Sequence, residues 1–218
     1  MLKDKNLDNK EKTVFYKKNS WRENIEAIFI AIIIALFIRT FIVQAFKIPS
    51  GSMLETLQIG DHILVNKFIY GIKIPFTDGT TIIPIKKPEK GDIVVFKYPE
   101  DPSVDFIKRV VAIGGDSVEI VDKKLYVNDK LVKETSYAIY TDKHTYPSVL
   151  SPRDNFKKTI VPENKIFVMG DNRDNSHDSR FWGFVSCKAV KGEAFMIYWS
   201  WNKKEFGVRW RRIGDILA

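Results

Sequence analysis

Residues 90–116 read KGDIVVFKYPEDPSVDFIKRVVAIGGD, and two β-branched runs within this stretch decide the fold class. Short runs rich in Val, Ile and Phe that are bounded by Gly, Pro and Asp are typical of β-strands, so we expect strands over 92–98 and 106–113. The same pattern recurs after residue 46, where few segments repeat apolar residues at the 3.6-residue period of a helix. The other expected strands cover residues 62–67, 81–85, 117–121, 125–127, 165–169 and 193–201.

A polar stretch breaks this strand pattern between residues 129 and 161. Residues 136–161 are polar overall, and Pro147, Pro152 and Pro162 punctuate them or follow directly. We expect this stretch to form a less regular excursion from the main sheet. The predicted fold class is therefore mainly β, with a small inserted subdomain around 129–161.

A hydrophobic segment precedes the strands. Residues 25–46 read IEAIFIAIIIALFIRTFIVQAF, and 22 residues of helix reach about 33 Å, enough to cross a hydrocarbon core of about 30 Å. Residues 1–24 carry seven Lys or Arg against four Asp or Glu, which predicts a cytoplasmic N-terminus. We therefore expect a cytoplasmic basic segment over 1–24, one transmembrane helix as an anchor over 25–46, and an extracytoplasmic β-rich domain over 47–218.

Two other interpretations of the hydrophobic segment compete with a retained anchor. The sequence Val43-Gln44-Ala45 fits the small-residue pattern of a cleavage site, so the segment could be a signal peptide that is removed. It could also be a core helix of a soluble domain, although a helix that is apolar on nearly all faces needs a large surrounding core.

The composition excludes several kinds of protein. The chain has 218 residues, of which 44% are hydrophobic and 28% charged, as in an ordinary globular domain. A single cysteine, Cys187, excludes an internal disulfide and a multi-thiolate zinc site, and three histidines leave little material for a metal centre. The net charge of +8 forms no obvious concentrated basic face, which argues against a nucleic-acid partner.

Two motifs could carry nucleophilic or acid–base chemistry. The sequence IPSGSM at 48–53 presents serine hydroxyls beside a proline and a glycine, but serine is a weak nucleophile that needs a base. Lys108 lies in an apolar run, on the strand face shared by Phe106 and Val110, while Arg109 points to the other face. Burial would lower the pKa of Lys108 and make it a possible general base. The alternatives are a turn without a catalytic role and a lysine at an exposed strand edge.

A third motif, GDNRDNSHDSR at 170–180, is dense in polar groups. It fits a calcium loop poorly, because Arg173 and Ser176 stand where a ligand and a glycine are wanted. Ser176, His177 and Asp178 are the residue types of a hydrolase triad, but adjacency in the sequence is not triad geometry. A scaffold with Asp–Arg pairs fits best, and a catalytic His177 or a metal loop are the alternatives.

These motifs together resemble those of bacterial type I signal peptidase. The resemblance covers most of residues 25–214 and leaves the insertion unmatched. Glu55 departs from the family pattern, which usually has proline there, and Lys108 indicates the Ser/Lys branch, since the eukaryotic-type relatives have histidine at this position. The stretches that follow the family's order and spacing are the apolar anchor, IPSGSM at 48–53, GDHILVNKFIYGI at 60–72, KGDIVVF at 90–96, FIKRVVAIGGD at 106–116, GDNRDNSHDSRFWG at 170–183 and VRWRRIG at 208–214.

The resemblance implies a β-rich fold and a residue for each part of an acyl transfer. It makes Ser52 the nucleophile and Lys108 the general base, with the Ser176 hydroxyl orienting the lysine. Ser50, together with the Ser52 backbone N–H, matches the oxyanion hole. The residues that match supporting salt-bridge positions are Asp171, Asp178 and Arg180. The residues that match positions lining the substrate pockets are Phe46, Ile48, Met53, Leu57 and Ile107.

The expected function is that of a membrane-anchored serine endopeptidase, a type I signal peptidase that removes signal peptides from exported preproteins and prefers Ala-X-Ala before the cut. No cofactor and no metal is expected. The expected partners are signal peptides and the lipid bilayer, without nucleic acid, and the chain is expected to be monomeric. We expect it in the cytoplasmic membrane, crossing once, with the catalytic domain on the outer face.

Two other functions share parts of this pattern. Self-cleaving SOS repressors use the same Ser/Lys pair, but the anchor and the 170–183 motif argue against them. A catalytically inactive, anchored binding protein on the same scaffold is disfavoured because Ser52, Lys108 and Ser176 are all present.

One group of aromatic residues is expected either to rest on the membrane surface or to pack in the core: Trp199, Trp201, Phe206 and Trp210.

Overall fold

The computed structural model describes residues 20–73 and 81–217. The chain divides after Phe37 into an N-terminal unit and a larger unit. Helix α1 (Ser20–Phe37) forms the described part of the first unit. The helical stretch Trp21–Ile42 is long and apolar enough to cross a membrane, with a mean hydropathy of 2.5 over its best window.

The helical stretch ends earlier than the predicted anchor. A short π-helical segment covers Ile38–Ile42, and strand β1 covers Val43–Lys47, whereas the sequence predicted helix as far as Phe46. β1 pairs antiparallel along its whole length with β2 (Asp61–Asn66). Val43, the first residue of β1, is β-branched and fits a pleated surface, and the pairing of β1 with β2 satisfies the backbone groups that a longer helix would have paired. The predicted end of the anchor at Phe46 is therefore wrong by four residues.

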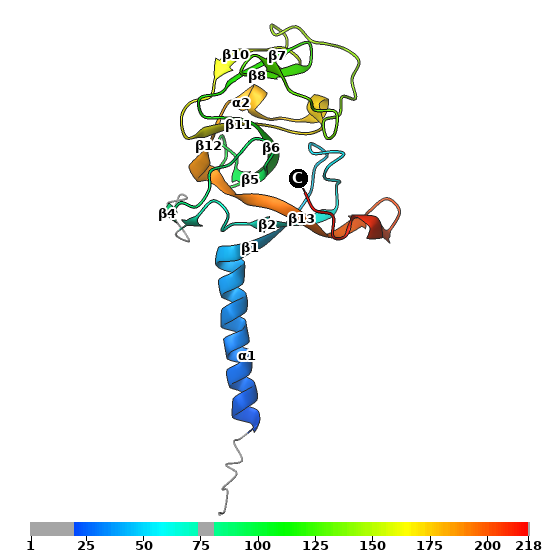
Figure 1. Cartoon of the computed structure of the whole chain (residues 1–218). Helices are drawn as coiled ribbons and strands as arrows, with labels where there is room; N and C mark the ends of the chain where they lie inside the picture. Colours follow the sequence, from blue (N-terminus) through cyan, green and yellow to red (C-terminus); the bar gives the residue numbers. More distant parts are fainter. Residues whose placement is uncertain (1–19, 74–80, 218) are drawn as a thin grey trace, which may run out of the picture. The chain divides into compact units, whose positions relative to one another are not determined.

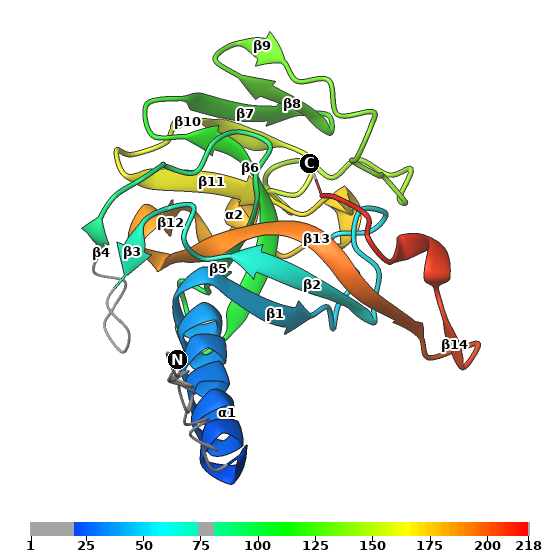
Figure 2. The ribbon, with the colours of Figure 1, turned by 60° about the horizontal axis from the view of Figure 1, so that its bottom comes forward.

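One antiparallel sheet organises the larger unit (Figures 1 and 2). The long strand β13 pairs with β2 on one side and with β5 on the other, and irregularities in its register let it follow both. The strands in order across this sheet are β1, β2, β13 (Val190–Asn202), β5 (Ile93–Lys97), β6 (Asp105–Ile113), β11 (Lys165–Met169) and β12 (Val185–Ser186), and β14 (Gly207–Val208) pairs with the end of β13.

A second, smaller sheet lies beyond β11 in the views of Figures 1 and 2. Its tight hairpins are set by local sequence. Asp122-Lys123 joins β7 to β8, Asn128-Asp129 joins β8 to β9, and all four residues have positive φ, as type I′ turns require. The strands in order are β10 (Phe156–Ile160), β7 (Ser117–Val121), β8 (Lys124–Val127) and β9 (Lys130–Leu131).

The inserted subdomain is larger and more regular than the sequence predicted. It was expected around 129–161, but its sheet begins at Ser117 and includes two of the predicted strands. β10 was not predicted, because residues 156–160 carry two adjacent lysines and the pairing with β7 is irregular there.

The short elements outside the inserted subdomain are β3 (Ile72–Lys73), β4 (Thr81–Ile83), α2 (Ser179–Trp182) and 3₁₀ turns at Arg173–Asn175, Cys187–Ala189 and Trp210–Arg212.

Apolar side chains form cores on both faces of the main sheet. Ile93 and Val95 of β5 belong to one cluster, whereas Val94 and Phe96 belong to another on the opposite face, so β5 is buried on both faces. A third cluster, which includes Phe167 of β11, joins the main sheet to the smaller one. The mainly β fold is confirmed, and its central strands provide a rigid, buried frame.

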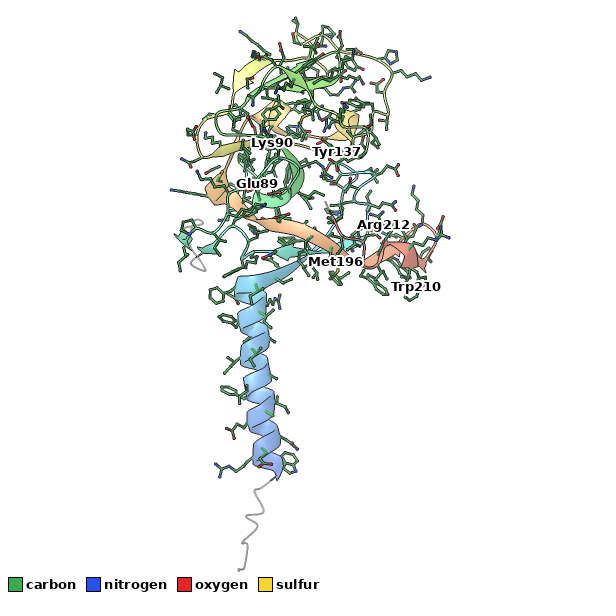
Figure 3. The ribbon with its side chains drawn as sticks, viewed as in Figure 1. Glu89, Lys90, Tyr137, Met196, Trp210 and Arg212 are labelled. Atoms are coloured by element: carbon green, nitrogen blue, oxygen red, sulfur yellow. The ribbon has the colours of Figure 1, made fainter. Side chains whose placement is uncertain are left out.

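The C-terminal aromatic residues do not pack in the core. Trp199 and Trp201 of β13 are each 37% exposed, and Phe206 and Trp210 are more exposed still. The rings of Trp199 and Trp210 meet edge to face, and Figure 3 shows Trp210 near the end of β13. The core-packing alternative for these residues is therefore wrong.

Candidate active site

Three segments that are distant in the sequence meet at the candidate site. The first is the connection from β1 to β2, which carries Ser52; we call residues 49–59 the nucleophile loop. Backbone hydrogen bonds close its base, from Ile48 N to Asp61 O at 2.8 Å and from Gly60 N to Ile48 O at 3.0 Å. The second segment is β6, and the third is the loop that follows β11; we call residues 170–178 the polar loop. Both are placed by the β6–β11 pairing, which sets Met169 opposite Arg109.

Lys108 and Ser52 are in direct contact. The Lys108 Nζ donates a hydrogen bond to the Ser52 Oγ at 2.8 Å and another to the Ile107 carbonyl at 3.0 Å. Lys108 is only 4% exposed, and its Nζ lies 5.2 Å from the centre of the Phe106 ring. Burial lowers the pKa of Lys108 to about 8; the Asp178 carboxylate opposes this shift, and the Arg180 guanidinium adds to it.

Gly170 allows the polar loop to approach both serines. A Cβ at this position would lie 2.3 Å from the Ser176 Oγ and 2.4 Å from the Ser52 carbonyl oxygen, closer than real atoms allow. Asn172 ties the same region to the nucleophile loop. Its backbone N–H donates to the Ser52 carbonyl at 3.1 Å, and its side-chain amide donates to the Gly51 carbonyl at 3.1 Å. The polar loop therefore holds the peptide groups on both sides of the Ser52 Cα.

Asp178 and Arg180 form a fully buried ion pair beside the polar loop. The Arg180 Nε and Nη2 donate to the two carboxylate oxygens at 2.8 and 2.7 Å, and the Gly170 N–H donates to the same carboxylate at 3.1 Å. Burial alone would raise the pKa of Asp178, but the Arg180 charge and these hydrogen bonds lower it below its usual value. Asp178 therefore stays charged and holds the loop.

Ser176 is buried next to this pair. Its hydroxyl lies near enough to Asp178 to contribute to the lowered pKa of that carboxyl. Among the described residues, however, the Ser176 Oγ has no hydrogen bond of good geometry, and so none to Lys108. The sequence predicted an orienting contact with the lysine, and that contact is not formed in this arrangement.

Asp171 pairs with an arginine that the sequence analysis placed on the other strand face. Arg109 Nε and Nη2 donate to the two Asp171 oxygens at 3.0 Å each, and both side chains are buried. Thr56 Oγ1 of the nucleophile loop also donates to Asp171, at 2.6 Å. Asp171 thus joins β6, the polar loop and the nucleophile loop.

Comparison with known proteins identifies this arrangement. A family model described as signal peptidase, peptidase S26, matches residues 21–199, well over half of the chain. The chain belongs to the signal peptidase family. Signal peptidase I of Pseudomonas aeruginosa is 40% identical over 204 residues, covering 81% of this chain and 72% of that protein. Signal peptidase I of Aquifex aeolicus is 38% identical, covering 82% and 84%. Signal peptidase I of Buchnera aphidicola from Schizaphis graminum is 36% identical, covering 94% and 85%.

These matches confirm the predicted function, that of a type I signal peptidase, and the predicted enzyme class, serine endopeptidase. Together with the apolar N-terminal helix they indicate a membrane-anchored protein. The relatives do not favour an inactive binding protein.

The five pocket positions predicted for this signal peptidase gather in one hydrophobic cluster, but they differ in exposure. Ile48, Met53 and Leu57 are at most 2% exposed and belong to its core. Phe46 and Ile107 are partly buried and pack against that core. Only these two therefore present appreciable surface. Ser50, predicted for the oxyanion hole, is exposed two residues before Ser52.

The alternative base and the alternative metal loop find no support in this site. His177 is exposed, and its Nε2 lies 3.3 Å from the Tyr98 hydroxyl, while the group that contacts Ser52 is Lys108. Within residues 20–73 and 81–217, no three His, Cys, Asp or Glu side chains come together in a way that could hold a metal ion.

Several residues of the site were missed by the sequence analysis. Arg109, Asn172 and Gly170 lie inside the quoted motifs, and polar or glycine residues in a family motif were the available signal. Arg212, from the C-terminal VRWRRIG motif, donates to the Thr56 carbonyl at 2.8 Å and to the buried Asp61 at 2.6 Å. The C-terminal motif therefore gives the nucleophile loop a second support, in addition to its contacts with the polar loop.

Proposed function

We propose that Ser52 is the nucleophile of this signal peptidase and that Lys108 is its general base. The observation that carries the proposal is the 2.8 Å contact between Lys108 Nζ and Ser52 Oγ in a buried environment that lowers the pKa of the lysine. When the amine is neutral, the same contact allows the Ser52 hydroxyl to donate its proton to Nζ.

The reaction then follows the chemistry of an acyl transfer. The Ser52 Oγ attacks the scissile carbonyl carbon while its proton moves to Lys108 Nζ. The C–N bond breaks, the leaving amine takes that proton, and the acyl group stays on Ser52. A water molecule then attacks the acyl carbon while Lys108 again takes a proton. The bond from that carbon to the Ser52 Oγ breaks, Lys108 returns the proton to the Oγ, and the acid product leaves and ionises to a carboxylate. The proposed donors to the developing oxyanion are the Ser52 backbone N–H and the Ser50 hydroxyl.

The buried ion pairs keep this machinery in place in our proposal. Asp171 and Asp178 hold the ends of the polar loop through Arg109 and Arg180. An arginine forms two directed bonds to a carboxylate, so each pair fixes an orientation as well as a distance. The Ser176 hydroxyl is proposed to orient Lys108 once a rotation of its side chain brings the two together.

The proposed substrates are the signal peptides of exported preproteins. An extended substrate that adds as a strand presents alternate side chains to one wall, so two shallow pockets would read the residue before the cut and the residue two places upstream. Phe46 and Ile107 pack on the core formed by Ile48, Met53 and Leu57, and we propose that they form the walls of pockets that admit small side chains only. This arrangement supports a preference for Ala-X-Ala.

The proposed localisation is the cytoplasmic membrane, with a single span. The basic segment of 1–24 would lie in the cytoplasm, and the catalytic domain, from residue 43 onward, on the outer face. The exposed Trp201 and Trp210 are proposed to contact the lipid headgroups. We propose a monomer without cofactor. Mass spectrometry of the mature protein tests the anchor: a chain beginning at Phe46 would show that the anchor is removed.

Cleavage of a model preprotein by the detergent-solubilised enzyme tests the proposed dyad. Ser52→Ala should abolish cleavage, because it removes the attacking oxygen. Ser148→Ala is a matched control, since this exposed serine lies in the insertion outside the segments that form the site, and it should cleave at the wild-type rate. Undiminished cleavage by folded Ser52→Ala would overturn the assignment.

A further inference from the structure

The insertion contributes a segment that contacts the polar loop of the candidate site. We call residues 134–140 the insertion arm. Ile139 N–H donates to the Asp171 carbonyl at 2.8 Å, and the Arg173 N–H donates to the Ile139 carbonyl at 3.0 Å. On its other side the same stretch of the polar loop bonds to Ser52 through the Asn172 N–H. Residues 171–173 therefore lie between the arm and the nucleophile loop.

A buried ion pair joins the arm to the polar loop. Arg173 Nη1 and Glu134 Oε1 are in contact, with side chains only 1% and 8% exposed. The Arg173 Nε donates to the Gly170 carbonyl at 3.1 Å, and the Tyr140 hydroxyl donates to Glu134 Oε2 at 3.1 Å. A guanidinium this deeply buried needs its anion, because an unpaired buried charge is strongly unfavourable. Glu134 thus keeps Arg173 in the position that holds Gly170.

A tyrosine of the arm lies between two arginines of the site. The Tyr137 ring lies 4.3 Å from the Arg109 guanidinium and 5.8 Å from that of Arg173. Tyr137, labelled in Figure 3, lines one cleft together with Val110 and Val111 of β6, so this side chain of the insertion faces the main sheet. The arm therefore contacts Arg173 and also Arg109, which follows Lys108 in β6.

We propose that Glu134 is a positioning residue that sets the Lys108–Ser52 geometry through Arg173 and the Gly170 carbonyl. This inference rests on the proposed roles of Ser52 and Lys108. Gly170 contacts the Ser52 carbonyl and the Ser176 hydroxyl, so a shift of its peptide moves the nucleophile relative to the base. The arm contributes no side chain to the cluster that holds the pocket residues.

The proposal predicts a change in turnover with little change in substrate binding. A misplacement of about 1 Å between reacting groups can lower a rate on the order of a hundredfold. A looser polar loop also lets water reach Lys108, which weakens the burial that lowers its pKa. Glu134→Gln should therefore lower kcat at least about tenfold, leave KM near the wild-type value, and move the acid limb of activity to higher pH.

Asp129→Asn is the matched control for Glu134→Gln. It also removes one insertion carboxylate from an ion pair, with Lys158, but both partners are exposed and the pair lies outside the contacts between the insertion arm and the polar loop. It should leave kcat, KM and the acid limb unchanged. Wild-type kcat and pH profile in folded Glu134→Gln would overturn the proposal.

A double variant separates positioning from simple support of the fold. In Glu134→Leu with Arg173→Met the buried charges are gone together, and the melting temperature should recover, because apolar residues of similar volume replace such pairs at little cost. The low kcat should persist, because no donor reaches the Gly170 carbonyl. Recovery of both melting temperature and kcat would show that the pair only supports the fold.

A conservative variant covers the case in which Glu134→Gln does not fold. Glu134→Asp keeps the charge but shortens the side chain by one methylene, and we expect a smaller loss of kcat with a shifted acid limb. Wild-type kinetics in Glu134→Asp would then count against the proposal. Ser52→Ala is assayed in parallel: its full activity would refute the proposed dyad, whereas its inactivity beside a fully active Glu134 variant would refute the positioning role alone.

Discussion

Lys108 of β6 and Ser52 of the nucleophile loop are joined by a 2.8 Å hydrogen bond across 56 positions of sequence. An unperturbed lysine, with a pKa near 10.4, is neutral in roughly one molecule in 2,500 at pH 7. The lowered pKa of about 8 makes the amine neutral in roughly one molecule in ten. Burial among apolar neighbours therefore supplies the proton acceptor that the serine needs.

The first prediction is the pH dependence of cleavage. Only the neutral amine accepts a proton, so kcat/KM should rise with pH and level off above the pKa of Lys108, with the midpoint of the acid limb near pH 8. The measurement is kcat/KM for a peptide substrate from pH 5 to pH 10. A flat profile across this range would contradict the lysine base.

Lys108→Arg provides the matching variant. A guanidinium keeps the positive charge but does not deprotonate in this range, so the variant should be inactive while its melting temperature shows that it folds. Near wild-type turnover in a folded Lys108→Arg enzyme would return His177 to consideration as the base.

The second prediction concerns Gly170. Gly170→Ala places a Cβ 2.3 Å from the Ser176 Oγ and 2.4 Å from the Ser52 carbonyl, so the polar loop must move away from the nucleophile loop. We expect kcat to fall on the order of a hundredfold. Gly207→Ala is the control, because its Cβ would meet no atom closer than 3.7 Å, and it should retain wild-type kcat. Equal activity of the two variants would refute the close packing at Gly170.

The parts of the site that could be predicted from the sequence carry their own local signal. Lys108 could be singled out because a lysine inside a β-branched run is unusual, and strand alternation correctly put Arg109 on the other face. Alternation, however, names no partner for Arg109. Its pairing with Asp171 depends on the register of β6 against β11, which local residue patterns do not determine.

The insertion shows the same limit more clearly. Glu134 lies in a stretch without a motif, and nothing local connects it with Arg173, 39 positions later. Their contact depends on the path of the chain through the second sheet. β10 of that sheet was itself not predicted, because Lys157 and Lys158 interrupt the apolar pattern of a strand. Similarly, the end of the anchor was misplaced because the apolar residues of β1 continue the hydrophobic run of α1.

The third prediction concerns the Asp171–Arg109 pair. Asp171→Asn leaves the buried Arg109 guanidinium without its anion, which should lower the free energy of unfolding by about 3–5 kcal/mol. Asp105→Asn, which breaks the partly exposed pair with Lys191, should lower it by at most about 1 kcal/mol. Chemical denaturation of the two variants measures both values, and similar losses would contradict the importance of the buried pair.

The last prediction separates the pocket surface from its support. Leu57 is fully buried, so Leu57→Ala should cost about 2–5 kcal/mol of stability through the cavity that it leaves. Ile107 is only partly buried and adjoins Lys108, so Ile107→Ala should enlarge the space that a substrate side chain enters. A panel of peptides with Ala, Val, Leu or Phe before the cut tests this. The wild-type enzyme should cleave only after small residues, because larger ones clash, whereas Ile107→Ala should accept Val or Leu with a higher relative kcat/KM. Efficient wild-type cleavage after Leu or Phe, or an unchanged preference in Ile107→Ala, would show that these residues do not line the specificity pocket.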